Sequence, residues 1–358
     1  MSPFPRPDYA ALRPYDPGRA PVAVDLSDNT NLWGPHPAAL ARMRAASPDD
    51  LRCYPEVYAD TLRHTIASRF GVPFECVTTG AGSDDVLDSA YRAASSPGAT
   101  VSFPAPTFSM VGDLARMNGM VPKPIDWQTA LDEPAVLLED DPALVYLCTP
   151  NNPTGALLPG DWIERLLDLR GGGDPLVLVD EAYIDFAGGS LISRAPRVQR
   201  LLVTRTCSKA YGLAGVRCGF GVGHADTVLE VEKARGPYKV SRLTVEAVAA
   251  ALEDADGWVG RTVAECLDNR DRLAAELAKR GLRVLESQAN FVLVGAPSGS
   301  AQADNDALRE QGVAARPFVG IPELGEGLRV TVGPWPLLER FLQALDRRLS
   351  ALKEVSAP

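Results

Sequence analysis

Residues 206–217 read Thr206-Cys207-Ser208-Lys209-Ala210-Tyr211-Gly212-Leu213-Ala214-Gly215-Val216-Arg217. The stretch follows apolar residues 201–204, which have the length and composition of a buried strand. It therefore places hydroxyls, a lysine and an arginine in a glycine-containing turn just beyond a strand end. A single lysine is most often a solvated surface residue, so Lys209 has to be interpreted together with the rest of the chain.

Three earlier segments carry a similar mixture of small and polar residues: 79–85 (TGAGSDD), 149–155 (TPNNPTG) and 180–183 (DEAY). The first is a glycine turn that opens a helix, where free backbone N–H groups can bind a phosphate. The second is a strand-terminal turn, and Asp180 follows four apolar residues. Taken alone, each has an ordinary explanation: a strand–helix turn, a loop, and a helix cap rather than a buried functional charge.

Short β-rich runs alternate with helical stretches in the first 225 residues, and this alternation predicts a largely parallel α/β sheet. The expected strands cover 75–79, 99–103, 143–148, 176–179, 201–204 and 218–222, and the expected helices cover 83–95 and 161–170. Ligands of such sheets bind beyond the carboxyl ends of the strands. All four polar segments fall at an expected strand end.

The remaining residues predict a smaller α+β domain. A long helical region from 225 to 280, with one break at 235–237, precedes short strands at 283–285, 291–294 and 328–332. Helices are expected at 304–311 and 336–352. We therefore expect an irregular N-terminal arm over 1–35, a large domain over 36–240 and a small C-terminal domain over 241–358.

Composition restricts the partners and the location. Acidic residues outnumber basic ones by 46 to 36, so a net charge of −10 disfavours nucleic acid and membrane surfaces as partners. No apolar run approaches the roughly 18 residues of a membrane span. The first eight residues contain three prolines and no apolar block, so no secretory signal is expected. These features predict a cytoplasmic protein.

The six cysteines form no C-x-x-C pair, and the chain has only three histidines. Zinc sites are typically built from closely spaced cysteines and histidines, so we expect no metal. Free thiols in a reducing compartment explain the cysteines.

Together, N-N-P-T-G (151–155), D-E-A-Y (180–183) and S-K-A-Y-G-L-A-G-V-R (208–217) resemble the fold-type I pyridoxal-phosphate enzymes. The similarity is to the class I/II aminotransferases, the group that contains histidinol-phosphate aminotransferase, and it runs from about residue 25 to 333. It implies an α/β protein with a large domain around a mostly parallel sheet and a smaller α+β C-terminal domain. It also implies an aminotransferase of amino-acid biosynthesis, with pyridoxal 5'-phosphate as cofactor and a 2-oxo acid as amino acceptor.

The resemblance assigns the catalytic and cofactor-binding roles. Lys209 matches the lysine that holds the cofactor covalently and then moves a proton at Cα. Asp180 matches the aspartate that keeps the pyridine nitrogen protonated. Tyr183 and Asn152 match the residues that hydrogen-bond the phenolic oxygen of the cofactor, and Phe108 matches the aromatic residue that stacks on its ring.

The resemblance also implies a phosphate site and a homodimer. The expected phosphate ligands are Gly82, Ser83, Asp84, Thr206, Ser208 and Arg217, of which Arg217 offers a planar fork. Tyr54 matches a tyrosine that reaches the phosphate of the neighbouring subunit, which would create composite active sites. An ordinary Tyr-Pro turn is the alternative for Tyr54.

On the substrate side, Arg329 matches the arginine that clamps the anionic group of the substrate, and Arg316 resembles a second arginine of the histidinol-phosphate group. Two guanidiniums suit a phosphate dianion, although a solvated surface charge is the alternative for Arg316. The arm reads N-T-N-L-W-G at 29–34, where relatives have N-E-N-P-aromatic-G. We expect Trp33, with Asn152, to contact the substrate, and the altered arm leaves related amino acids open as substrates.

Two other activities remain compatible with these motifs. Relatives on the same scaffold include threonine-phosphate decarboxylase and enzymes that catalyse eliminations or cyclisations. The bond that breaks depends on which Cα substituent lies perpendicular to the cofactor ring. A cofactor-retaining regulator without turnover is a third possibility, but such proteins usually carry a DNA-binding module, and no basic N-terminal domain precedes the arm.

Overall fold

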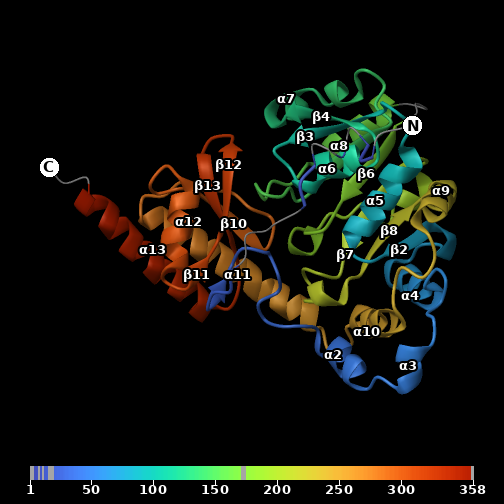
Figure 1. Ribbon diagram of the computed structural model, residues 1–358, viewed down its shortest axis with the longest axis horizontal. Helices are drawn as coiled ribbons and strands as arrows, with labels where there is room; N and C mark the ends of the chain where they lie inside the picture. Colours follow the sequence, from blue (N-terminus) through green and yellow to red (C-terminus); the bar gives the residue numbers. More distant parts are fainter. Residues whose placement is uncertain (1–3, 7–8, 10–11, 15–19, 171–174, 356–358) are drawn as a thin grey trace.

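The computed structural model describes residues 4–6, 9, 12–14, 20–170 and 175–355. Figure 1 shows two sheets, each covered by helices, which lie side by side and are bridged by the long helix α11 (Trp258–Lys279). Part of the expected arm, residues 1–35, falls outside the described residues. Within the described part of the chain, every helix is too short or too polar to cross a lipid bilayer.

The larger sheet has the order β2-β8-β7-β6-β5-β3-β4 within the described residues. Pairing is parallel except at β8, which runs antiparallel to both of its neighbours. This confirms the α/β class with a mostly parallel sheet. The strands are β2 (Val77–Gly80), β3 (Thr100–Ala105), β4 (Val121–Asp126), β5 (Leu144–Cys148), β6 (Leu176–Asp180), β7 (Leu201–Thr206) and β8 (Gly219–Gly223).

Both faces of this sheet are buried, which explains why its central strands read as nearly continuous apolar runs. On β5, Tyr146 belongs to the hydrophobic cluster of one face, whereas Val145 and Leu147 belong to the cluster of the other. The first face is covered by α5 (Ser83–Ala94), α6 (Met110–Met117) and α9 (Ala225–Arg235). The opposite face is covered mainly by α4 (Asp60–Phe70) and α8 (Gly160–Arg170). The shorter helices of this part are α2 (Pro37–Arg44), α3 (Pro48–Arg52) and α7 (Trp127–Asp132).

The smaller sheet is antiparallel and has the order β12-β13-β10-β9. Its strands are β9 (Val284–Leu285), β10 (Phe291–Gly295), β12 (Arg316–Ile321) and β13 (Gly325–Thr331), and it packs with α11, α12 (Ala301–Arg309) and α13 (Trp335–Val355). A separate parallel pair joins β1 (Val24–Asp25) to β11 (Val313–Ala314). This pair fixes the N-terminal arm against the smaller half of the molecule.

The structure corrects two details of the expected elements. The helical region over 225–280 has a second break, because Asp254 and Gly257 both adopt left-handed backbone conformations between α10 (Arg242–Glu253) and α11. The strand β4, an edge strand with Pro122 and Pro124, was not expected, and neither was β12. Strand β12 also lies at the edge of its sheet and includes Pro317, which suits an edge strand but weakens the strand signal in the sequence.

The division into domains stays a proposal, but one helix bears on its boundary. A boundary at residue 240 assigns α10 to the small domain. The contacts of α10, however, are with α2 and α4, beside the larger sheet. We therefore propose that the small domain begins after α10, near Asp254.

Candidate active site

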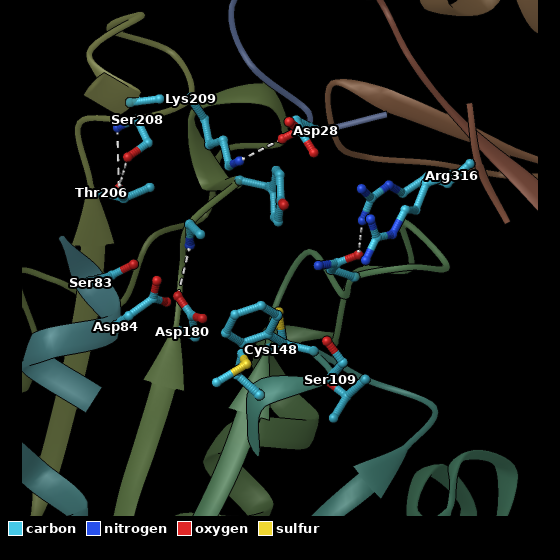
Figure 2. Close-up of a pocket in the computed structure, with 18 of the residues that line it drawn as sticks. Asp28, Ser83, Asp84, Ser109, Cys148, Asp180, Thr206, Ser208, Lys209 and Arg316 are labelled. Carbon is cyan, nitrogen blue, oxygen red and sulfur yellow. Dashed lines mark hydrogen bonds between the residues drawn. The ribbon is translucent and has the colours of Figure 1, made fainter. Parts of the chain in front are cut away.

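A cavity of about 610 Å³ lies beyond the carboxyl ends of β5, β6 and β7, where the smaller sheet faces the larger one. Its wall includes most of the residues that the sequence motifs selected (Figure 2). These are Ser83, Asp84, Phe108, Asn152, Asp180, Tyr183, Thr206, Ser208, Lys209, Arg217, Arg316 and Arg329. The structure therefore brings together residues that are as far apart as 83 and 329 in the sequence.

Lys209 lies in the turn between β7 and β8 and points into the cavity (Figure 2). Its Nζ donates a 3.1 Å hydrogen bond to the backbone oxygen of Asp28 and lies 5.6 Å from the ring centre of Tyr183. Burial, with a smaller contribution from the positive charge of Arg329, lowers the pKa of the Lys209 amine to about 8. About half of this amine is therefore neutral near pH 8, and the neutral form is the one that a nucleophile or proton acceptor requires.

Asp180 ends β6 and is buried, although its carboxylate borders the cavity. Three donors contact it: the Tyr146 hydroxyl at 2.9 Å, the Ala182 amide at 3.2 Å and the Thr204 hydroxyl at 3.3 Å. Burial raises the pKa of Asp180 to about 6, and the hydrogen bond from Tyr146 opposes that rise most strongly. The carboxylate is thus an anion at neutral pH that would gain a great deal from a cation in the cavity.

Tyr183 and Asn152 are each held by a side-chain hydrogen bond. The Tyr183 hydroxyl accepts a 3.1 Å hydrogen bond from Nδ2 of Asn29, and burial raises the pKa of its phenol to about 12. The Oδ1 of Asn152 accepts a 2.5 Å hydrogen bond from Nη1 of Arg329. Both side chains therefore enter the cavity in fixed orientations.

The residues expected to bind phosphate gather at the N-terminal end of α5. The Thr206 and Ser208 hydroxyls lie 3.0 Å apart, and Arg217 hydrogen-bonds the carbonyls of Ala81 and Ala214 at 3.4 and 3.2 Å. Gly82 has a φ of +91°, and a Cβ at this position would collide with the guanidinium of Arg217. The glycine thus leaves room for a compact group of hydroxyls, helix N–H groups and a guanidinium, which is the donor set that a phosphate needs.

Arg329 and Arg316 approach the cavity from the smaller sheet. Arg329 is buried, and its Nη2 donates a 2.6 Å hydrogen bond to the backbone oxygen of Ser27. Its guanidinium lies between two aromatic rings, 5.2 Å from the centre of Phe318 and 5.4 Å from the centre of Phe291. Arg316 is half-buried and lines the cavity.

Three expected site residues do not line the cavity. Gly82 lies directly behind it, and Trp33 packs against the hydrophobic core instead, while its neighbour Leu32 contacts Gly333. Thr30 is the residue of this arm segment that reaches the wall. Tyr54 is 81% exposed and stacks on Tyr238, with ring centres 5.2 Å apart.

Several wall residues carried no signal of their own in the sequence. Cys148 and Ala182 could have been inferred, since Cys148 directly precedes the motif at 149–155 and Ala182 lies within the motif at 180–183. Asp28 and Phe318 could not, because the contacts of the arm and of β12 form only in the tertiary structure. The other wall residues that were not selected from the sequence are Thr107, Ser109, Met110, Leu114, Ala214 and Pro317.

The fold and this cavity define an aminotransferase scaffold, and the family comparison agrees: the chain belongs to the class I and II aminotransferases, whose pattern it matches over residues 21–345. Among curated relatives, it is 38% identical to histidinol-phosphate aminotransferase 1 of Pseudomonas aeruginosa, over 96% of this chain and 99% of that protein. It is 37% identical to histidinol-phosphate aminotransferase 2 of Rhizobium meliloti, over 98% and 100% of the two chains.

A solved structure shows the same architecture. Histidinol-phosphate aminotransferase from Sinorhizobium meliloti, in complex with pyridoxal-5'-phosphate, superposes with a TM-score of 0.87 at 26% identity. The alignment covers 98% of this chain and all of the other. The fold-type I architecture expected from the motifs is therefore confirmed.

Proposed function

We propose that this chain is a pyridoxal-phosphate-dependent aminotransferase that acts on histidinol phosphate or a closely related amino acid and passes the amino group to a 2-oxo acid. The proposal rests mainly on one observation: the cavity holds a half-buried amine, a buried carboxylate and a pair of arginines at separate positions on its wall. The relatives named histidinol-phosphate aminotransferase support the choice of substrate.

The residues present fit the cofactor. Gly82 leaves room for the guanidinium of Arg217 beside the other expected phosphate ligands, and the Lys209 amine has a lowered pKa that favours covalent attachment to an aldehyde. Asp180 would face the pyridine nitrogen. When bound, pyridoxal phosphate supplies an electron-accepting ring for reactions at Cα.

Three side chains of the protein would supply proton transfer, charge stabilisation and substrate orientation. Lys209 would carry a proton to and from Cα, because its amine can be neutral near pH 8 and is already fixed beside Tyr183. By remaining ionised, Asp180 would stabilise a positive charge on the pyridine nitrogen of the cofactor. Arg329 would orient the substrate through its anionic group, and the aromatic rings of Phe291 and Phe318 would hold the guanidinium in place.

The arginine pair supports a substrate with a phosphate group. A dianion is neutralised better by two guanidiniums than by one, and both Arg316 and Arg329 line the same cavity. The decisive experiment mixes the cofactor-loaded enzyme with histidinol phosphate, in the absence of an acceptor, and records the cofactor spectrum. We expect conversion to the amino form of the cofactor and release of a ketone.

Two results would contradict this activity. Release of carbon dioxide from an amino acid of a test panel, or of a leaving group from any tested amine, with the cofactor regenerated unchanged, would indicate a decarboxylase or an elimination enzyme instead. A spectrum that fails to change with any member of a panel of amino acids would support a binding protein. A preference of about a hundredfold for another amino acid over histidinol phosphate would retain the aminotransferase but change its substrate.

A homodimer is part of the proposal. The exposed Tyr54 lies among other exposed apolar side chains, Leu51, Val57, Tyr58 and Tyr238, on one surface formed by α3 and the segments beside it. A second copy of the chain could cover this surface and receive Tyr54 at its own phosphate site. A cytoplasmic location also belongs to the proposal, and cell fractionation tests it.

A further inference from the structure

We propose that Tyr146, a residue outside the cavity wall, is a positioning residue that holds the Asp180 carboxylate ionised and correctly oriented. Its hydroxyl donates a 2.9 Å hydrogen bond to Oδ2 of Asp180, and both residues are buried. The inference rests on the proposed function, because it assigns Asp180 to the cofactor. It adds a residue that the sequence motifs do not mark.

Strand register explains why Tyr146 can act on Asp180 without entering the cavity. On the adjacent strands β5 and β6, Cys148 pairs with Asp180, and Tyr146 pairs with Leu178. Tyr146 and Cys148 are two residues apart, so their side chains lie on the same face of the sheet. Cys148 reaches the cavity wall, whereas Tyr146 lies one step deeper, beneath it.

The hydrogen bonds to Asp180 divide between its two oxygens. Oδ1 receives the Ala182 amide at 3.2 Å and the Thr204 hydroxyl at 3.3 Å, whereas Oδ2 receives the Tyr146 hydroxyl at 2.9 Å. A hydrogen bond from a neutral donor to a carboxylate is among the stronger kinds, especially where water is excluded. Tyr146 therefore donates the shortest of these three hydrogen bonds, and it holds Oδ2 of the carboxylate.

Tyr146 itself stays protonated. Burial and the nearby charge of Asp180 raise the pKa of its phenol far above the ordinary value, so the group serves only as a donor to the carboxylate. Other titratable groups that act on Asp180 or on this tyrosine are Asp84 and Tyr91 from α5 and Cys148 from β5. Of these, Asp84 raises the pKa of Asp180, so Tyr146 counteracts both burial and a neighbouring anion.

Tyr91 provides a matched control within the same hydrophobic cluster. It is fully buried like Tyr146, but its hydroxyl has no hydrogen-bond partner among the described residues. Replacing either tyrosine by phenylalanine removes one buried oxygen from the same region. Only the replacement at 146 removes a hydrogen bond to Asp180.

The test compares Tyr146→Phe with Tyr91→Phe in the full-length enzyme loaded with cofactor labelled by ¹⁵N in the ring. In Tyr146→Phe, we expect the ¹⁵N resonance to move toward that of an unprotonated ring nitrogen, because a less stabilised carboxylate retains the proton itself. The half-reaction with an amino donor should slow roughly 10- to 100-fold, the loss expected for one hydrogen bond to a charged group. Tyr91→Phe should leave the resonance in place and the rate within about twofold of the parent.

Equal effects of the two substitutions would overturn the proposal, since they would show a packing role alone. Should Tyr146→Phe fail to fold, 3-fluorotyrosine incorporated at position 146 preserves the volume and strengthens the donor, and the resonance should then move toward the protonated form. No movement would reject the inference. Because the resonance needs only bound cofactor, an enzyme that binds cofactor but converts no amino donor would disprove the proposed function and still decide the role of Tyr146.

If the protein binds no cofactor at all, the proposed function fails and the inference is judged on the cofactor-free chain. There, ¹³C NMR of labelled aspartate follows the protonation of Asp180. The pH of half-protonation should rise by about one unit in Tyr146→Phe relative to Tyr91→Phe. An unchanged value would overturn the inference.

Discussion

Arg316 and Arg329 are direct partners across the antiparallel strands β12 and β13. Directly opposed residues of such a pair project from the same face of the sheet, with Cβ atoms about 5 Å apart. Two like charges at this spacing repel each other in the absence of a ligand. An anion placed between them would relieve the repulsion, so the sheet itself presents a site for a group with two negative charges.

This pairing predicts unequal effects of removing the two arginines. Arg329→Ala should weaken transition-state binding of every substrate by roughly 2–5 kcal/mol, because it leaves a desolvated anion unpaired. Arg316→Ala should impair histidinol phosphate more than amino acids that carry only a carboxylate. The measurement is kcat/KM for each variant across a substrate panel. Arg283→Ala, just before strand β9 of the same sheet and paired with Glu323 at the surface, is the control and should change little.

Lys209→Ala should abolish turnover and the covalent attachment of the cofactor, since one amine serves both purposes. Borohydride reduction followed by peptide mass spectrometry locates the modified lysine in the parent enzyme. The control is Lys123→Ala, which removes a lysine paired with Asp140 away from the cavity. Reducible cofactor still attached to another lysine of Lys209→Ala would show that the assignment is wrong.

Asp180→Asn should retain much of the cofactor but lose several orders of magnitude in rate. An amide cannot stabilise a positive charge on the ring nitrogen, so reactions at Cα lose their electron acceptor. Single-turnover rates with a saturating amino donor provide the measurement. A loss of less than about tenfold, or roughly 1.4 kcal/mol, would contradict the role.

The same substitution should stabilise the cofactor-free protein above pH 6. Because the pKa of Asp180 is raised from 3.8 to about 6, the folded state binds its proton more tightly than the unfolded state. Below pH 4, protonated Asp180 therefore contributes about 3 kcal/mol to the free energy of unfolding, and this contribution is lost as the pH rises through 6. Denaturant unfolding should find Asp180→Asn more stable than the parent at pH 8, with the difference shrinking toward pH 4. A difference independent of pH would refute the explanation.

Tyr54 should act on the site of the partner subunit. Mixing Tyr54→Phe with Lys209→Ala should form hybrid dimers in which one site keeps both residues and the other keeps neither. Activity per hybrid dimer should then recover to about half that of the parent, whereas each variant alone stays impaired. Tyr58→Phe, in the same exposed surface, is the control. A monomer at working concentration in light scattering would exclude the shared site.

The sequence predicts best those site residues whose neighbours in the chain indicate the same functional role. Lys209 stands in a glycine turn with hydroxyls on one side and Arg217 on the other, and Asp180 ends an apolar strand, so a polar residue there needs an explanation. The larger sheet was predictable for the same reason. Its central strands are buried on both faces, and their composition depends little on what lies elsewhere in the chain, whereas the partly exposed edge strand β4 was not predicted.

The contributions that arise from tertiary pairing were not predictable. Tyr146 sits inside an apolar strand and looks like any aromatic core residue until register places it beside Asp180. The edge strand β12 contains a proline and a glycine, which weaken the strand signal. Trp33 was expected in the substrate pocket because its neighbours in the chain resemble a family motif, but its side chain packs on the core.

The segment 27–29 contacts three residues of the active site, two through main-chain oxygens and one through a side chain. Lys209 and Arg329 are held there by backbone oxygens, of Asp28 and Ser27, whereas Tyr183 is held by the side chain of Asn29. Main-chain oxygens persist whatever side chain the residue carries. Of the two residues that supply these oxygens, Asp28 lines the cavity, so substitutions at 28 can change the shape and charge of the cavity wall while Lys209 keeps its hydrogen bond to the main chain. A segment of this kind allows substitutions to alter substrate specificity while the main-chain hydrogen bonds that position the reactive residues are retained.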